Sequence, residues 1–298
     1  MTRQPAPRHW ILLGLLSLGW GFAFLLIAVA LASFPPLTLV SLRLLLGAAA
    51  LYVIMRWQGL RLPASGRWWL LFTGLSITGN LIPFTLITWA EVHITSGQAG
   101  LLMALVPIST LVLAHFFVAH EQITGGRLAG VAMGFCGVAV LVGADALRGL
   151  GGPALVAQLA VVAATFSYAV NNIFAKRLPA LNGLVIATGT LLAGGVLLLP
   201  TALWLEQPWQ LAVTRNAWLA TAALGLFSTG LATWVYFVVV TEVGPNFVSL
   251  INYLIPLLSF AAGALLLGEA VHAWQFAGLL AVCCGIALCQ PRRRQAGS

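Results

Sequence analysis

Residues 10–32 read WILLGLLSLGWGFAFLLIAVALA, a run of 23 residues without a charged side chain. A helix rises about 1.5 Å per residue, so this run can cross the roughly 30 Å hydrocarbon core of a bilayer. Arg3 and Arg8 precede it, and Ala30-Leu31-Ala32 has the small-x-small pattern of a signal-peptide cleavage site. Because the run is longer than the apolar region of a typical signal peptide, we expect it to remain as a membrane span.

The rest of the chain has the same character. Of its 298 residues, 61% are hydrophobic and only 7% are charged, whereas soluble domains carry roughly 25% charged residues. The apolar runs are continuous and do not alternate with polar residues, which favours helices over the strands of a barrel. We therefore expect an all-α membrane protein embedded in the lipid bilayer. Its ten predicted spans are residues 10–32, 37–55, 68–89, 96–118, 127–144, 154–174, 184–204, 217–240, 246–267 and 272–289.

The basic residues indicate the orientation. With the N-terminus in the cytoplasm, eleven of the fourteen Lys and Arg residues fall on the cytoplasmic side, and only Arg148 and Arg215 fall outside. Arg43 lies within the second span. This bias follows the positive-inside rule and predicts two cytoplasmic termini in the bacterial inner membrane. The net charge of +8 is thus a topology signal, and no nucleic-acid partner is expected.

The two halves of the chain repeat each other. Three dipeptides recur 151 residues later, and four single residues recur 148 residues later. The dipeptides are Gly74-Leu75, Thr78-Gly79 and Glu91-Val92, matched by Gly225-Leu226, Thr229-Gly230 and Glu242-Val243. The single residues are Glu121, Gly130, Cys136 and Gly137, matched by Glu269, Gly278, Cys284 and Gly285. Since each half has five spans, residues 1–150 and 151–298 are predicted to be inverted repeats, as in many secondary transporters.

The acidic residues all fall at span ends or in loops. They are Glu91, Glu121, Asp145, Glu206, Glu242 and Glu269. We therefore expect no buried acid, which argues against a mid-membrane proton relay and favours a neutral or zwitterionic substrate. Four of them, Glu91, Glu121, Glu242 and Glu269, act either as gates or ion pairs, or as charges near water or a helix N-terminus. Arg43 has three alternatives: it holds a substrate carboxylate, reaches the membrane interface, or ties a neighbouring carbonyl.

Polar and aromatic side chains inside the spans are the candidates for substrate binding. The amides need partners in lipid, so they either bond between helices or line a wet cavity. Aromatic rings offer apolar and stacking surface. The candidates are Trp20, Asn80, Gln98, Tyr168, Asn171, Asn172, Trp234, Asn252 and Tyr253, with Trp89 as a further ring. Pro107 and Pro256 lie at equivalent depths, where each removes a backbone hydrogen bond and is expected to shape the cavity or act as a hinge.

Nothing in the sequence indicates catalysis, a metal or a cofactor. Cys136, Cys283, Cys284 and Cys289 lie in apolar runs without metal-ligand spacing, and the histidines are scattered. No catalytic residue is predicted, so an enzyme is not expected. Small-residue faces at Gly130, Gly134, Gly137, Gly278 and Gly285 predict close helix packing, either within a monomer or across a weak homodimer.

Several motifs, spread over nearly the whole chain, resemble the drug/metabolite transporter superfamily in its ten-helix EamA-type branch. They are Trp20-Gly21, Pro35-Pro36 followed by Arg43, the prolines Pro107 and Pro256, Leu267-Gly268-Glu269, and Tyr168-Ala169-Val170-Asn171 leading to Lys176. The chain departs from this pattern at His120, where the family has Gly, and in the seventh span, which lacks an arginine corresponding to Arg43.

Within that branch the chain is most similar to YddG-type aromatic amino acid exporters. The resemblance implies a central cavity lined by helices 1, 3, 4, 6, 8 and 9, and export of amino acids or related small metabolites. Three alternatives remain: the same fold exporting a nucleoside, polyamine or drug, a membrane-embedded enzyme, or a receptor.

Overall fold

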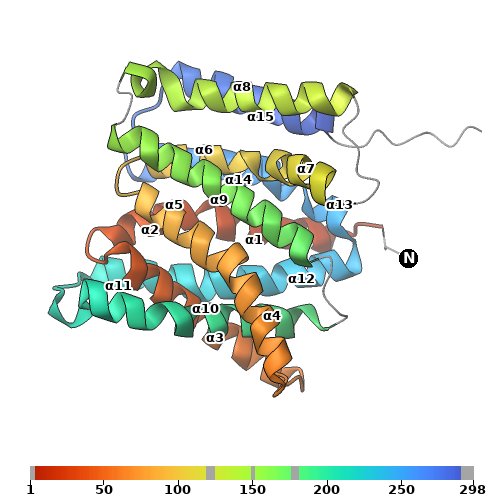
Figure 1. Ribbon diagram of the computed structural model, residues 1–298, viewed down its shortest axis with the longest axis vertical. Helices are drawn as coiled ribbons and strands as arrows, with labels where there is room; N and C mark the ends of the chain where they lie inside the picture. Colours follow the sequence, from red (N-terminus) through yellow and green to blue (C-terminus); the bar gives the residue numbers. More distant parts are fainter. Residues whose placement is uncertain (1–3, 119–124, 149–151, 176–180, 290–298) are drawn as a thin grey trace, which may run out of the picture.

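The computed structural model describes residues 4–118, 125–148, 152–175 and 181–289. Every regular element in these ranges is helical, and the helices run side by side in a layered bundle (Figure 1). This follows from the solvent, because a helix satisfies its backbone hydrogen bonds internally and lipid offers none.

The first half of the chain forms five helical spans, three of which are interrupted. The elements are α1 (Pro7–Gly21), α2 (Ala23–Leu31), α3 (Pro36–Trp57), α4 (Gly66–Ser76), the π-helix η1 (Ile77–Leu81), α5 (Ile82–Ala90), α6 (Ser96–Leu102), the 3-10 turn η2 (Met103–Leu105), α7 (Val106–Phe117) and α8 (Gly125–Arg148). The first, third and fourth spans are each built from two α-helices joined by a short irregular segment.

The second half repeats this arrangement. Its elements are α9 (Pro153–Ala175), α10 (Gly183–Glu206), the short turn η3 (Pro208–Gln210), α11 (Arg215–Ala223), the π-helix η4 (Leu224–Leu231), α12 (Ala232–Glu242), α13 (Pro245–Val248), α14 (Ile251–Leu266) and α15 (Ala273–Cys289). Eight helical stretches of 19 to 28 residues are apolar enough to cross a membrane, and two shorter apolar helices, α14 and α15, complete the set. The predicted ten-helix fold is confirmed, whereas the predicted boundary between residues 150 and 151 lies outside the described residues.

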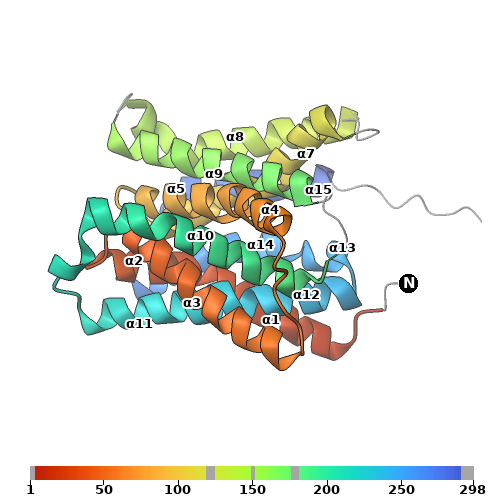
Figure 2. The same ribbon diagram turned by 60° about the horizontal axis from the view of Figure 1, so that its bottom comes forward.

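The two halves are interlocked. The largest helix contacts join α8 to α15, α3 to α10, α5 to α9, α3 to η4, α14 to α6 and α7 to α9, and each pair takes one helix from either half. Figures 1 and 2 show α8 beside α15 along one edge of the bundle. The buried core clusters also draw on both halves. Neither half therefore buries its apolar surface alone, and the seam between them is the interior of the protein.

The helix breaks coincide with the repeated sequence. The π-helices η1 and η4 contain Thr78-Gly79 and Thr229-Gly230, the matched dipeptides of the repeat. Pro107 follows the 3-10 turn η2. Pro256 lies inside α14, soon after the turn that separates it from α13. The prolines thus sit beside interrupted helix segments, and their role as hinges stays a prediction.

Glycines hold α8 and α15 together, as their spacing predicts. A Cβ added at Gly285 would lie 2.7 Å from the carbonyl oxygen of Gly130 and 2.8 Å from the backbone nitrogen of Gly134. A Cβ added at Gly137 would lie 2.8 Å from the carbonyl oxygen of Gly278. The two backbones touch without intervening side chains, so this small-residue face packs within one chain.

Replacing Gly285 by Leu should therefore destabilise the fold. The new side chain meets rigid backbone, and overpacking of this kind costs about 1–3 kcal/mol. Gly14→Leu is the matched control, because a Cβ at that helical glycine meets nothing within 4 Å. Thermal unfolding in detergent should show a lower midpoint for Gly285→Leu than for Gly14→Leu. Equal midpoints would mean that α8 and α15 are not closely packed.

Candidate substrate site

Arg43 is buried in the seam between the two halves, with only 7% of its surface exposed. Its Nε donates a hydrogen bond of 2.8 Å to Thr229 Oγ1 of η4, and its guanidinium carbon lies 3.7 Å from the ring centroid of Phe84 on α5. Arg43 thus links three helices by a hydrogen bond and a cation–π contact. The prediction that Arg43 reaches the membrane interface is wrong, because its side chain is buried. Arg43 does bond to a neighbouring group, but the acceptor is a hydroxyl oxygen and not a carbonyl oxygen.

The π-helix η4 prepares Thr229 for this contact. Its hydroxyl donates to the carbonyl oxygen of Leu224, five residues earlier, at 2.9 Å. With its proton used inside the π turn, the oxygen presents a lone pair to Arg43. π-Helical turns inside longer helices occur frequently at functional sites. Thr229 was not among the predicted site residues, although its place in the repeat was the signal that could have identified it.

The matching π-helix η1 contacts α9. Thr78 Oγ1 donates to Asn171 Oδ1 at 3.1 Å, and Ser167 Oγ donates to the Thr78 carbonyl oxygen at 2.8 Å. A Cβ added at Gly79 would lie 2.8 Å from the Asn171 amide group, so only glycine permits this approach. The two repeated Thr-Gly pairs therefore both lie where polar groups cross the seam.

The adjacent amides Asn171 and Asn172 point to different neighbours, as residues 100° apart on a helix should. Asn171 faces η1, whereas the exposed Asn172 donates from Nδ2 to Thr110 Oγ1 of α7 at 3.3 Å. Both form the helix–helix hydrogen bonds of the structural alternative. Their part in substrate binding stays a prediction.

The other predicted amides are half-buried and have spare hydrogen-bonding capacity. Asn80 lies in η1, Gln98 in the first turn of α6, and Asn252 at the start of α14. Among the described residues, none of the three forms a hydrogen bond through its side-chain amide. Their amides are available to a bound solute, and their part in substrate binding stays a prediction.

The predicted aromatic residues lie along the seam. Trp20 of α1 contacts Tyr236 of α12 with ring centroids 5.6 Å apart. Tyr168 packs against two core clusters at once, as does Trp234, and Tyr253 packs against one of them. Trp89 instead lies at the end of α5 against His93, with centroids 4.9 Å apart. Aromatic surface is thus spread through the interface between the halves.

On the outer side of the bundle, two carboxylates of the second half cap helices of the first. Glu269 accepts hydrogen bonds from Ser96 N, Ser96 Oγ and Gly97 N at 2.8, 2.6 and 2.9 Å. Glu206 accepts from Leu37 N at 2.9 Å and from Thr38 N and Oγ1 at 2.6 and 2.7 Å. These carboxylates satisfy helix N-terminal N–H groups and face the positive end of the helix dipole. For Glu269 the helix-end interpretation is therefore right.

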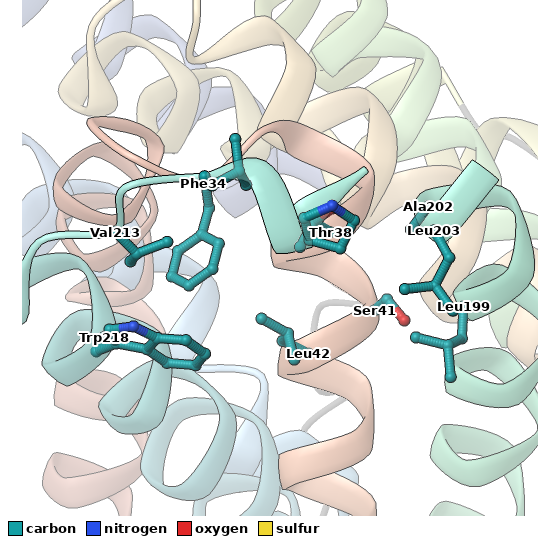
Figure 3. Close-up of a pocket in the computed structure, with 11 residues that line it drawn as sticks. Phe34, Thr38, Ser41, Leu42, Leu199, Ala202, Leu203, Val213 and Trp218 are labelled. Carbon is teal, nitrogen blue, oxygen red and sulfur yellow. The ribbon is translucent and has the colours of Figure 1, made fainter. Parts of the chain in front are cut away.

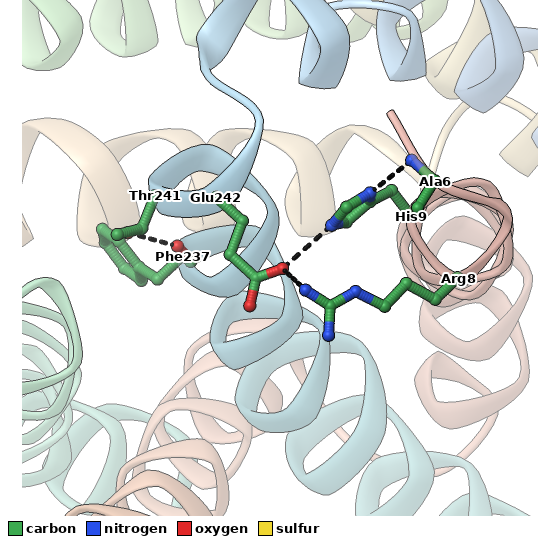
Figure 4. A network of polar contacts seen from close by, with 6 residues as sticks. All are labelled: Ala6, Arg8, His9, Phe237, Thr241 and Glu242. Carbon is green, nitrogen blue, oxygen red and sulfur yellow. Dashed lines mark hydrogen bonds and ion pairs between the residues drawn. The ribbon is translucent and has the colours of Figure 1, made fainter. Parts of the chain in front are cut away.

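On the opposite, cytoplasmic side, Glu242 ties the end of α12 to the start of α1 (Figure 4). Its Oε2 lies 2.8 Å from Arg8 Nη2 and 2.9 Å from His9 Nε2. His9 Nδ1 accepts from the Ala6 backbone nitrogen at 2.8 Å, so the ring proton is on Nε2 and points at Glu242. For Glu242 the ion-pair interpretation is confirmed. Glu121 and the side chain of Asp145 lie outside the described part of the structure.

Glu91 is half-buried as a residue, but its carboxyl group is covered, contrary to the expectation that no acid would be buried. It follows the last residue of α5, and both of its carboxyl oxygens are shielded from solvent without a hydrogen-bond partner among the described residues. Burial and the neighbouring Glu269 raise its pKa well above the usual value, and Arg43 opposes this shift. Because Glu91 follows the end of a span, we expected its carboxylate to face water. The loop that carries Glu269 instead packs against the turn that follows Glu91.

One described cavity lies away from these residues. It has a volume of about 370 Å³ and apolar walls at the outer ends of α3, α10 and α11 (Figure 3). Its lining includes Phe34, Leu199 and Trp218, and none of the predicted substrate residues takes part. Thr38 and Ser41 are its only hydroxyl-bearing residues, so we assign it no role in binding a polar solute.

A model of the EamA-like transporter family matches the chain twice, over residues 8–143 and 155–289. A protein of Streptantibioticus cattleyicolor named "Probable terminal-alkyne amino-acid exporter" is 30% identical, covering 84% of this chain and 82% of its own. An Escherichia coli protein named "Probable amino-acid metabolite efflux pump" is 28% identical, covering 90% and 89%. A crystal structure 20% identical in sequence covers 95% of this chain and 97% of its own with a TM-score of 0.68, which shows the fold alone.

Replacing Thr229 by Val should destabilise the protein. The change keeps the shape but removes the acceptor of the buried Arg43, which costs about 1–3 kcal/mol. Thr229→Ser keeps the acceptor and should stay near wild type. Thr241→Val is the control, because that exposed hydroxyl bonds only to its own helix. Thermal midpoints in detergent test this, and a Thr229→Val midpoint equal to that of Thr241→Val would contradict it.

Proposed function

Because the chain belongs to the EamA-like transporter family, we propose that it exports amino acids, aromatic or large neutral ones, across the bacterial inner membrane. It is a multi-pass membrane transporter and not an enzyme. In the proposal, the solute enters the seam between the halves and leaves on the other side by alternating access. Closer likeness to the YddG-type exporters is part of this proposal.

The names of the relatives support this cargo class. One relative is named for terminal-alkyne amino acids and another for amino-acid metabolites. Both cover more than four-fifths of the chain, so the likeness extends over both halves. The cargo nevertheless depends on side chains in the seam, because one fold serves many solutes.

The make-up of the seam is the observation that carries the proposal. Charged groups of both signs, Arg43 and Glu91, occur there with amides and aromatic rings. Aromatic surface suits a large apolar side chain, and opposite charges suit a solute without net charge. A polyamine would instead need several acids and no arginine.

The ties at the two ends support alternating access. Glu269 and Glu206 join the halves on the outer side, and Glu242 joins α12 to α1 on the cytoplasmic side. Each tie consists of a few hydrogen bonds that water can replace, so either end can open while the other stays closed. Inverted repeats permit this exchange by swapping the conformations of the two halves.

Transport by purified protein in liposomes tests the cargo. Vesicles loaded with labelled Trp, Phe, Thr or a nucleoside should release Trp and Phe faster than protein-free vesicles, because aromatic rings line the seam. Release of the nucleoside alone would replace the amino-acid cargo by another metabolite. No release of any amino acid above that of empty vesicles would contradict the proposal.

The seam amides should affect the rate. Asn171→Ala and Asn252→Ala should each lower the initial rate of Phe release several-fold, because a bound solute loses a hydrogen-bonding partner. Gln210→Ala, at an exposed amide in η3, is the control. Thermal midpoints of all three variants show whether they are folded. Unchanged rates in both folded variants would remove these residues from the site.

A further inference from the structure

Arg43 and Glu91 are ionisable groups of opposite kind in the seam, and among the described residues neither has an ion-pair partner. The hydrogen bond of Arg43 uses Nε, so the N–H groups on Nη1 and Nη2 are unused within the described ranges. Both oxygens of Glu91 lack partners within the same ranges. The two groups influence each other electrostatically, but they form no ion pair with each other.

The helix α5 explains this separation. Arg43 lies over Phe84, and Glu91 follows seven residues later on the same face, two turns or about 10 Å along the axis. Helical side chains lean towards the N-terminus, so Glu91 reaches back towards Arg43. Thr88 lies between them on this face, fully buried, and its Oγ1 also has no partner among the described residues.

The unpaired atoms are sorted by chemistry. Those at the Arg43 end are N–H donors, and those at the other end are the oxygens of Thr88 and Glu91. Buried polar atoms without partners are costly, and the exceptions in a native protein need an explanation. A carboxylate needs donors and an ammonium group needs acceptors, so the two ends complement the two charges of one zwitterion.

We propose that Arg43 binds the α-carboxylate and Glu91 the α-ammonium of a zwitterionic amino acid, with Thr88 as a further acceptor for the ammonium. This assignment rests on the proposed function and names the residues that select its cargo class. The solute is held by its backbone groups, while its side chain extends along the aromatic seam past Tyr168. Glu91 and Thr88 thereby join the site as residues that were not among the predicted substrate-binding residues.

The empty site should bind a proton in place of the ammonium. The charged groups that act on Glu91 are Arg43 of α3 and Glu269 of the loop after α14, and the titratable His93 lies two residues away. Since the pKa of Glu91 is raised, its carboxyl stays protonated to higher pH when the site is empty. An arriving ammonium favours the charged carboxylate and releases that proton. Affinity should therefore rise with pH until Glu91 is ionised in the empty protein.

Analogues that lack one charge test the assignment. In liposomes, exchange of labelled Phe is inhibited by unlabelled Phe, by its methyl ester, which has no carboxylate, or by N-acetyl-Phe, which has no ammonium. For wild type, each analogue should inhibit about tenfold less well than Phe, since each loses charge-assisted hydrogen bonds. Equal inhibition by Phe and both analogues would overturn the assignment without any variant.

Variants then attribute each charge to one residue. Arg43→Gln should weaken inhibition by unlabelled Phe about tenfold but leave inhibition by the methyl ester nearly unchanged. Glu91→Gln should likewise weaken inhibition by Phe about tenfold, but leave inhibition by N-acetyl-Phe nearly unchanged. As the pH rises above the ordinary range of a carboxyl group, affinity for Phe should rise in wild type, because Glu91 has a raised pKa, but not in Glu91→Gln. Arg56→Gln, at an exposed arginine of the same helix α3, is the control.

The outcomes separate the two proposals. If wild type exchanges Phe but each folded variant weakens inhibition by Phe, the methyl ester and N-acetyl-Phe equally, the assignment of Arg43 and Glu91 is wrong. The proposed amino-acid cargo then still stands. If wild type exchanges no amino acid, both proposals fail together. Should Arg43→Gln not fold, Arg43→Lys keeps the charge but loses the forked donor geometry, and it should weaken Phe more than the methyl ester.

Discussion

A polar group inside a bilayer must find its partner within the protein, and this constraint organises the whole chain. Continuous helices meet it for the backbone along most of each span. The exposed N–H groups at the starts of α3 and α6 meet it through the carboxylates of Glu206 and Glu269. Because these carboxylates belong to the second half, satisfying helix ends also locks the two halves together.

The same constraint explains the side-chain hydrogen bonds at the two π-helical breaks. In η1 and η4 the backbone departs from the regular α-helix, and side chains compensate. Thr229 bonds within its own π turn and accepts from Arg43, and Thr78 donates to Asn171 across the seam. A repeated sequence feature thus produces two of the polar contacts between the halves. Their partners differ between the halves, so the pseudo-symmetric scaffold carries an asymmetric site.

Unsatisfied groups stand out against this background. Most polar side chains that cross the seam have partners, but the guanidinium of Arg43 and the oxygens of Thr88 and Glu91 keep spare hydrogen-bonding capacity along one face of α5. In the proposed complex a zwitterion completes these groups. Its two charges then balance those of Arg43 and Glu91, so the membrane interior gains no net charge.

The sequence by itself determined the fold. Ten apolar runs, loop arginines and a repeat at a nearly constant offset suffice, because lipid permits few backbone arrangements and helix length must match membrane thickness. It also marked Arg43, Asn171 and the repeated Thr-Gly pairs as unusual. Only the tertiary structure decided which polar groups are partnered: Asn171 and Asn172 bond between helices, Glu269 caps a helix, and Glu91 is covered though it follows the end of a span. Burial and pairing depend on helices distant in sequence, and periodicity along one chain does not encode which of them meet.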